Sequence, residues 1–301
     1  MLIPCSTPSA LDFMKHLGKT EEKATKKIKE FLVDSNEDAI HDLRVSIRKI
    51  DSVLRILPRN VRSRNKVLNY RSRYKQLFKL NSELRDIDII SSKLKAYPAR
   101  LTLDQGYMLD ERLKALRSEK LKEARERALL TIGLRALEID ENEISDKKIY
   151  RRFHKIICRY AERIEKGLPN VVSDEGKIKE LHKLRKDCKK LRYTLNLLDS
   201  QTKQNRNTVS LREYLENLQD TLGSIHDCDI MIQYLRATYS AFVESGGDIA
   251  NFHSMVQLEQ KKRQSLYHAF LDLHGEGENT KTNLAIPQHT GRSMIQQAAA
   301  R

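Results

Sequence analysis

The chain contains 301 residues, with 56 Lys and Arg against 41 Asp and Glu, and its formal net charge is +15. A magnitude of about 2–8 is enough to keep a small domain soluble, so this excess predicts an anionic partner. Only 11 Gly and 6 Pro are present, too few to connect many short strands, which excludes a strand-rich fold and favours long helices.

Capping residues, prolines and the spacing of apolar residues predict eight long helices. The expected helices cover residues 8–34, 36–57, 61–97, 104–138, 145–167, 173–198, 207–245 and 248–273. The expected N-caps of four of them are Thr7, Asn36, Asp104 and Ser145. The apolar periodicity stops at about residue 275. We therefore expect a helical domain over residues 1–275 and a loose tail over residues 276–301.

The two halves of the chain resemble each other. Residues 40–57 align with residues 181–198 without a gap at an offset of 141, and six of the eighteen pairs are identical. Residues 80–90 align with residues 221–231 at the same offset. A shared offset predicts an internal duplication, with four helices in each half over about residues 8–139 and 145–273.

Targeting signals and metal motifs are missing from the sequence. The N-terminus has no basic start followed by an apolar stretch, and no 18 apolar residues run together. The four cysteines form no CxxC pair. These features predict a cytoplasmic protein with no membrane partner, no disulfide framework, no metal and no cofactor.

Basic side chains form a stripe beside the apolar seam of the second expected helix. The stripe contains His41, Arg44, Arg48 and Arg55, which lie within about 60° of one another around the helix and are all basic. The duplicated helix repeats it with His182, Arg185 and Lys189, widened by Lys186, Lys190 and Arg192. Packing of the two seams would bring both stripes to the edges of one groove.

Phosphate is the partner that these residue types fit best. Arg offers a bidentate fork to phosphate oxygens, Lys a flexible charge, and His a donor that an anion would protonate. The alternative is that the stripes pair with acidic residues on other helices, namely Asp86, Asp88, Asp227 and Asp229.

A second basic segment extends from residue 59 to residue 79, with eight Lys and Arg and no acidic residue. Arg64, Arg71 and Lys75 fall on one side of the expected helix, where they could extend the phosphate track. The alternative is an ordinary solvated helix, since other cations of the segment point the opposite way.

These patterns resemble the CHAD family, named for conserved histidines in an α-helical domain. The strings are H-x-x-R-V-x-x-R-K at residues 41–49 and L-H-K-L-R-K-x-x-K-K-L-R-Y at residues 181–193, each followed by a helix containing D-x-D. The resemblance covers about residues 8–273. It implies an all-α bundle of two four-helix halves around a basic central channel that binds inorganic polyphosphate. Family members occur alone, on polyphosphate granules, or fused to a CYTH domain. No E-x-E-x-K motif is present, so the stand-alone type is the closer match.

The resemblance also implies a set of polyphosphate ligands. Carried over by position, these are His41, Arg44, Arg48, Lys49, Arg55, His182, Arg185, Lys186, Lys189, Lys190 and Arg192. Asp51 stands where the family usually has another Arg, so this chain departs from the pattern at one position of the groove.

Two other functions compete with polyphosphate binding. A metal-dependent phosphohydrolase would need clustered acids, but residues two apart on a helix diverge by about 200°. We therefore expect Asp86, Asp88, Asp227 and Asp229 to hold the basic stripes by hydrogen bonds, and no enzymatic activity, since known catalytic motifs are absent. Nucleic acid is the stronger rival because any polyanion suits a basic groove, although aromatic residues for stacking make up only 6% of the chain.

Overall fold

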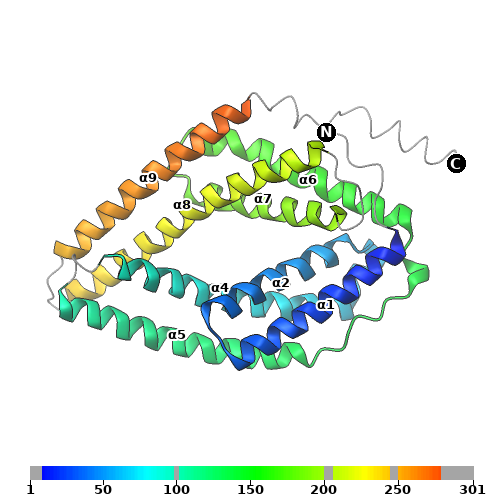
Figure 1. Ribbon diagram of the computed structural model, residues 1–301, viewed down its shortest axis with the longest axis horizontal. Helices are drawn as coiled ribbons and strands as arrows, with labels where there is room; N and C mark the ends of the chain where they lie inside the picture. Colours follow the sequence, from blue (N-terminus) through cyan, green and yellow to red (C-terminus); the bar gives the residue numbers. More distant parts are fainter. Residues whose placement is uncertain (1–8, 98–101, 200–205, 245–249, 279–301) are drawn as a thin grey trace.

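The computed structural model describes residues 9–97, 102–199, 206–244 and 250–278, and within these ranges the protein is all-α, as predicted. Figure 1 shows long helices arranged side by side. In chain order they are α1 (Ala10–Val33), α2 (Glu37–Ile56), α3 (Arg59–Arg62), α4 (Asn65–Lys95), α5 (Leu103–Ile132), the short 3-10 helix η2 (Glu141–Glu143), α6 (Asp146–Val172), α7 (Ile178–Asp199), α8 (Arg206–Glu244) and α9 (Ala250–Glu278).

Each half of the chain forms one group of packed helices (Figure 1). In the first half α2 packs against α1 and α4, and α4 packs against α5. The second half follows the same order, with α7 between α6 and α8 and with α9 against α8. The two groups meet through α2 against α7 and α4 against α8. The helices that carry the predicted basic stripes, α2 and α7, therefore lie next to each other.

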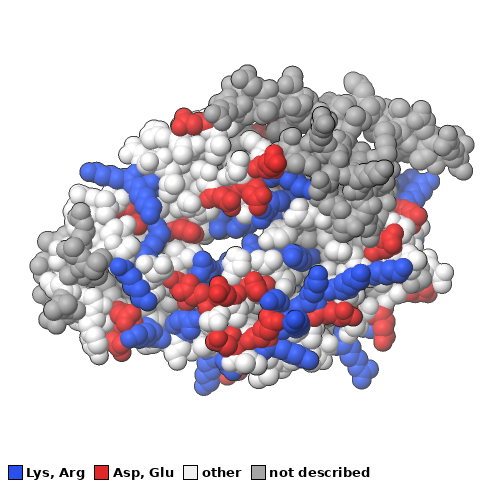
Figure 2. All heavy atoms as spheres, viewed as in Figure 1, with Lys and Arg blue, Asp and Glu red and all other residues white. Residues whose placement is uncertain are grey.

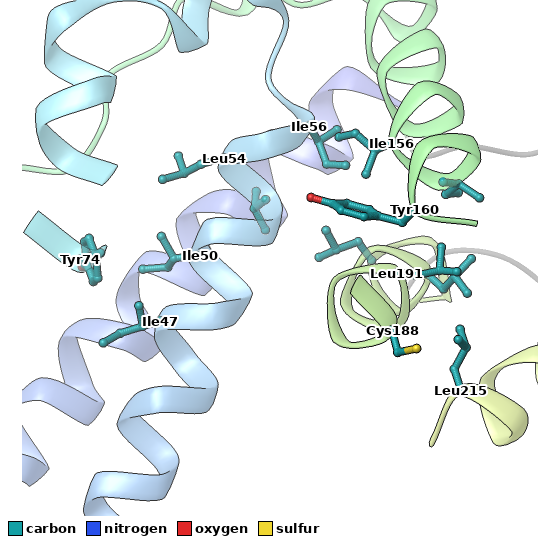
Figure 3. Packing of buried hydrophobic residues seen from close by; sticks show 14 of the residues in the cluster. Ile47, Ile50, Leu54, Ile56, Tyr74, Ile156, Tyr160, Cys188, Leu191 and Leu215 are labelled. Carbon is teal, nitrogen blue, oxygen red and sulfur yellow. The ribbon is translucent and has the colours of Figure 1, made fainter. Parts of the chain in front are cut away.

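Apolar faces of both groups merge into one core. Figure 3 shows Ile50 and Leu54 of α2 on the side of Tyr74, and Ile56 of α2 beside Tyr160 of α6, with Leu191 of α7 nearby. All of these side chains are buried and belong to the same cluster. A second cluster joins α4, α5, α8 and α9, with Phe252 and Met255 fully buried. The apolar seam that the sequence predicted on α2 is thus the surface that fixes the position of its basic stripe.

The predicted helix starts are partly confirmed. Asn36 accepts from the backbone N–H of Ala39, and Ser145 accepts from that of Lys148, as expected of N-caps. The prediction of Asp104 is wrong, because Thr102 caps α5 in a reciprocal capping box with Gln105. The predicted cap Thr7 lies outside the described residues. Within them, Ser9 is the N-cap of α1.

Two of the expected helices differ in extent from the prediction. The third expected helix is divided into α3 and α4 at Ser63, whose hydroxyl donates to the Arg59 carbonyl, so the described ranges hold nine α-helices instead of eight. The helix α6 continues through Pro169. A proline within a helix costs about 3 kcal/mol, but burial of Leu168 and Val171 contributes about 1.5–3 kcal/mol for each side chain.

Two further boundaries are shifted by local contacts. The helix α7 begins at Ile178 and not at residue 173, because the Asp174 carboxylate accepts from the Gly176 N–H and closes a turn before the helix. At the other end of the chain α9 continues to Glu278, so the first residues of the predicted tail at 276–301 are helical; residues 279–301 lie outside the described part.

Buried ion pairs attach the outer helices α5 and α9. The Arg117 guanidinium donates to Asp88 at 2.8 Å and to the Ser35 carbonyl at 2.9 Å. In the second half Arg263 donates to Asp229 at 2.6 Å and to the Glu175 carbonyl at 2.8 Å. The prediction that Asp88 and Asp229 hold the basic stripes is therefore wrong, because both carboxylates face outer helices. The matching positions support the duplication, which stays a prediction.

The Asp229–Arg263 ion pair gives the first testable prediction. Both side chains are about nine-tenths buried, and removal of one partner leaves the other charge buried without compensation. We expect Asp229→Asn to lower the free energy of unfolding by about 3 kcal/mol, measured by urea denaturation. The control is Asp110→Asn, which breaks an exposed pair with Lys114 and should change it by less than about 1 kcal/mol. Equal effects would contradict the assignment.

Candidate functional site

The candidate site is the surface between α2 and α7, where the two basic stripes come together. Figure 2 shows that the molecule is hollowed near the centre of this view, and that Lys and Arg atoms line the hollow. Arg44 and Arg48 come from α2, and Arg185 and Lys189 come from α7. We call these four residues the central cluster. Within the described ranges, no carboxylate oxygen lies within 4 Å of a side-chain nitrogen of these four residues, so none of them forms an ion pair.

Aromatic rings hold the arginines of α2 in position. The Arg48 guanidinium lies 5.9 Å from the ring centre of Phe78 and 5.6 Å from that of Tyr193. Its Nε donates to the Arg44 carbonyl at 3.3 Å. The Arg44 guanidinium lies 5.6 Å from the ring centre of Phe78. Cation–π contacts of this kind orient a guanidinium without neutralising it. The cationic ends therefore remain available to a ligand.

Burial and mutual repulsion destabilise the charges of the central cluster. Burial, and after it the neighbouring Arg48, lower the pKa of Arg44 to about 10. Burial also lowers the pKa of Lys189 to about 7, with Arg185, Arg48 and Arg44 acting in the same direction. Like charges at close range disfavour the protonated form, so an anion that enters the cluster would bind to groups that lack a counter-charge.

Two histidines form a pair at one end of the cluster. The Nδ1 atoms of His182 and His226 are 3.3 Å apart, and their ring centres are 4.4 Å apart. Burial, followed by the surrounding cations, lowers their pKa values to about 4 and about 3 respectively. His226 was not identified from the sequence, because it lies on α8 and only the packing of α8 on α7 brings it to the stripe.

The first-half counterpart of this histidine pair is more open. His41 is exposed, and its pKa is lowered by partial burial and then by Arg48 and Arg85. Arg85 occupies the position 141 residues before His226, and it forms an ion pair with Glu37 at 3.2 Å. The two ends of the groove therefore share one layout but differ in charge.

Two carboxyl groups face the central cluster without pairing with it. Burial raises the pKa of Asp86 and of Asp227, while Arg44 and Arg185 respectively lower them in part. The charge of Asp227 also raises the pKa of Asp86. These carboxyl groups moderate the repulsion between the cations through space. Among the described residues, no group of three or more His, Cys, Asp or Glu side chains is arranged to hold a metal ion.

Asp51 forms ion pairs with two of the predicted ligands, Arg55 and Arg71. Its carboxylate accepts from Arg55 at 2.6 Å and from Arg71 at 2.8 Å, and Arg55 also donates to the Tyr160 hydroxyl. Burial would raise the pKa of Asp51, but the two arginines outweigh it and hold the pKa below its ordinary value. The family departure at Asp51 is therefore an internal ion pair.

The remaining predicted ligands lie outside the central cluster. Partners are found for Arg64 with Glu143, Arg192 with Glu216, and Lys190 with Asp187 at 3.2 Å. Lys49, Lys75 and Lys186 are exposed, and Lys49 acts on the pKa of His16, which places it towards α1. The structure thus brings together four of the predicted cations and His182. Lys186 lies close enough to lower the pKa of His182, and Arg192 lies over the same Tyr193 ring as Arg48.

Comparisons with known proteins agree with this fold. The family model of the CHAD domain matches residues 16–236. A crystal structure of the CHAD domain from the plant Ricinus communis superposes with a TM-score of 0.60 at 15% sequence identity and covers 95% of both chains. PptA from Streptomyces chartreusis also gives a TM-score of 0.60, at 12% identity, over 91% of this chain and 100% of its own. Among curated proteins, none matches the sequence.

The helical bundle and its cationic groove define an all-α protein with clustered positive charge between its two halves. Since the family model covers most of the chain, the chain belongs to the CHAD family, as the sequence motifs predicted. No helix within the described ranges has the length and apolar character needed to cross a membrane.

The lowered pKa of Lys189 gives the second prediction. Its value falls from 10.5 to about 7 in the folded chain, so the unfolded chain holds more protons between these two pH values and the stability of the protein rises as the pH rises through them. Below about pH 7 the buried charge of Lys189 lowers the free energy of unfolding by a constant amount of up to about 5 kcal/mol. Lys189→Met should therefore stabilise the free protein at pH 7, with an advantage that shrinks towards pH 10.

Urea denaturation at several pH values measures this effect. The control is Lys183→Met, since Lys183 lies on the same helix with an exposed side chain. An identical pH dependence in Lys189→Met and in the unmodified protein would show that Lys189 is not crowded by the neighbouring arginines.

Proposed function

We propose that the protein binds inorganic polyphosphate in the groove between α2 and α7 and does not hydrolyse it. The observation that supports this most directly is the central cluster, because four adjacent cations have no ion-pair partner within the described residues. Arginine and lysine in this arrangement match the oxygens of a phosphate chain. Membership of the CHAD family, whose domain is known for polyphosphate binding, points in the same direction.

A ligand without bases fits the groove better than a nucleic acid. Binding of single strands usually depends on bases that stack on open aromatic rings. In this groove the rings of Phe78 and Tyr193 face the guanidinium of Arg48, and Tyr193 also lies 5.7 Å from Arg192. The arginines therefore occupy the ring faces that bases would need.

The absence of hydrolysis is part of the proposal. Catalysis by metal ions at phosphate groups needs carboxylates that converge on the ion. Asp88 and Asp229 are engaged by Arg117 and Arg263, which leaves Asp86 and Asp227 as the carboxyl groups near the cluster. We expect no release of inorganic phosphate when the protein is incubated with polyphosphate and Mg²⁺.

Binding of a phosphate chain would also take up protons. An anion beside Lys189, His182 and His226 favours their charged forms and raises their pKa values. Affinity should therefore increase as the pH falls, with Lys189 contributing at and above its free-state pKa of about 7 and the histidines contributing at lower pH. We propose the cytoplasm, including polyphosphate granules, as the place where the chain meets this ligand.

Removal of the central cluster tests the proposed function. We expect the combined substitution of Arg44, Arg48, Arg185 and Lys189 by Ala to abolish retention of long-chain polyphosphate, because four uncompensated charges are lost from one place. The matched control replaces four exposed lysines on outer helices by Ala, namely Lys29, Lys122, Lys261 and Lys262. Isothermal titration measures affinity, and circular dichroism checks helicity. An equal loss of affinity in both variants would show that binding depends on net charge and not on the central cluster.

Competition separates polyphosphate from nucleic acid. Both ligands lose affinity with salt, with a slope of about −0.7 for each phosphate contacted in a single strand, so salt dependence alone does not distinguish them. At fixed ionic strength we expect single-stranded RNA to displace labelled polyphosphate only when its phosphate concentration is in large excess. Displacement at equal phosphate concentration would favour the nucleic-acid function instead.

A further inference from the structure

A second group of cations lies where the end of α2 meets α3 and α6. Arg152 and Arg159 are two turns apart on one side of α6, and Arg59 and Arg62 form the ends of α3. Arg152 donates through Nε to the carbonyl of Arg55, in the last turn of α2, at 2.9 Å. We call Arg59, Arg62, Arg152 and Arg159 the outer cluster. The sequence did not single out its α6 members.

The cations of the outer cluster are close enough to repel one another. Burial, and after it Arg62 and Arg159, lower the pKa of Arg152 to about 10. The pKa of Arg62 is lowered by burial and then by Arg159 and Arg59. In the part of the chain that the structure describes, no carboxylate oxygen lies within 4 Å of these four guanidinium groups. The outer cluster therefore shares the main property of the central cluster, which is positive charge without a counter-charge.

Asp51 separates the two clusters. It lies between Arg48 and Arg55 in the sequence of α2, and both of its carboxylate oxygens are occupied by Arg55 and Arg71. From Arg44 to Arg55 the axis of α2 advances by about 16 Å. The free cations are thus divided into two groups along α2, with a neutralised segment between them.

A purely structural role accounts for Arg152 alone. Its bond to a carbonyl in the last turn of α2 supplies one of the partners that helix ends need. Arg62 is half-buried and Arg159 is exposed, and neither side chain donates to a backbone carbonyl within the described residues. An arginine that served only as a cap would not need two further unpaired arginines beside it, since their charges oppose its own.

We propose that the outer cluster is a second phosphate-binding site, occupied by the part of a long polyphosphate chain that extends past Asp51. This proposal rests on the proposed function of the groove and adds a dependence on chain length to it. A short chain reaches only the central cluster, while a long chain contacts both clusters. The protein would then select long chains through two separate sites.

The test compares two chain lengths in one variant. The double substitution Arg62→Gln and Arg159→Gln removes two cations of the outer cluster and leaves the cap formed by Arg152. For long-chain polyphosphate we expect affinity to fall by about three- to tenfold and the salt slope to decrease in magnitude by about 1.4. For tripolyphosphate, affinity should stay within about twofold of the unmodified protein, because its few phosphates do not reach past Asp51.

The matched control is Lys147→Gln with Arg151→Gln. Both residues are exposed and lie on α6, rotated by about 100° or more about the helix axis from Arg152, so the control removes the same charge from another side of the same helix. An equal loss in the control, or an equal loss for tripolyphosphate, would overturn the second site. If the double variant loses helicity, Arg159→Gln alone is used, because this side chain is exposed. The criteria stay the same, and the expected change in the salt slope is half as large.

The same experiment distinguishes the second site from the proposed function. Failure of the unmodified protein to bind either ligand would overturn the proposed function. Normal binding of both ligands by the double variant would overturn only the second site and leave the groove in place.

Discussion

The structure depends on keeping like charges together without counter-charges. Arg44, Arg48, Arg185 and Lys189 repel one another, so the helices that carry them need another source of attraction. The apolar cluster shared by α2, α6 and α7 supplies it (Figure 3), and buried ion pairs fix α5 and α9 behind the inner helices. The helices that carry the charged side chains are thus held together by contacts outside the central cluster, and its cations stay without ion-pair partners among the described residues.

The sequence predicted those features that depend on one helix at a time. The all-α class, the seam of α2 and the basic stripe beside it follow from the spacing of residues three and four apart. The same spacing placed Arg44 and Arg48 on one side, and it placed Arg185 and Lys189 on the matching side of α7. Local capping chemistry at Asn36 likewise needs no tertiary contact, and it is found as predicted.

Features that depend on packing between helices were not predicted. His226 enters the site because α8 packs on α7, and Arg152 enters the outer cluster because α6 crosses the end of α2. The same reason explains why Asp88 was assigned to the stripe although it faces Arg117, since the sequence does not tell which neighbour a carboxylate will face. Tertiary burial also overrides local preference at Pro169, where the apolar face of α6 keeps the helix intact.

Repulsion in the free protein and affinity for an anion are two effects of the same arrangement. A net charge far from zero destabilises a compact chain, and a ligand that binds only the folded state stabilises it by mass action. A polyanion that neutralises the central cluster removes the repulsion and adds its own contacts, so it gains more than the contacts alone provide. Asp51 shows the opposite solution, because an internal carboxylate neutralises Arg55 and Arg71 permanently. Substitutions that relieve repulsion within the groove should therefore stabilise the free protein and weaken binding together, whereas those in the apolar core should affect stability first.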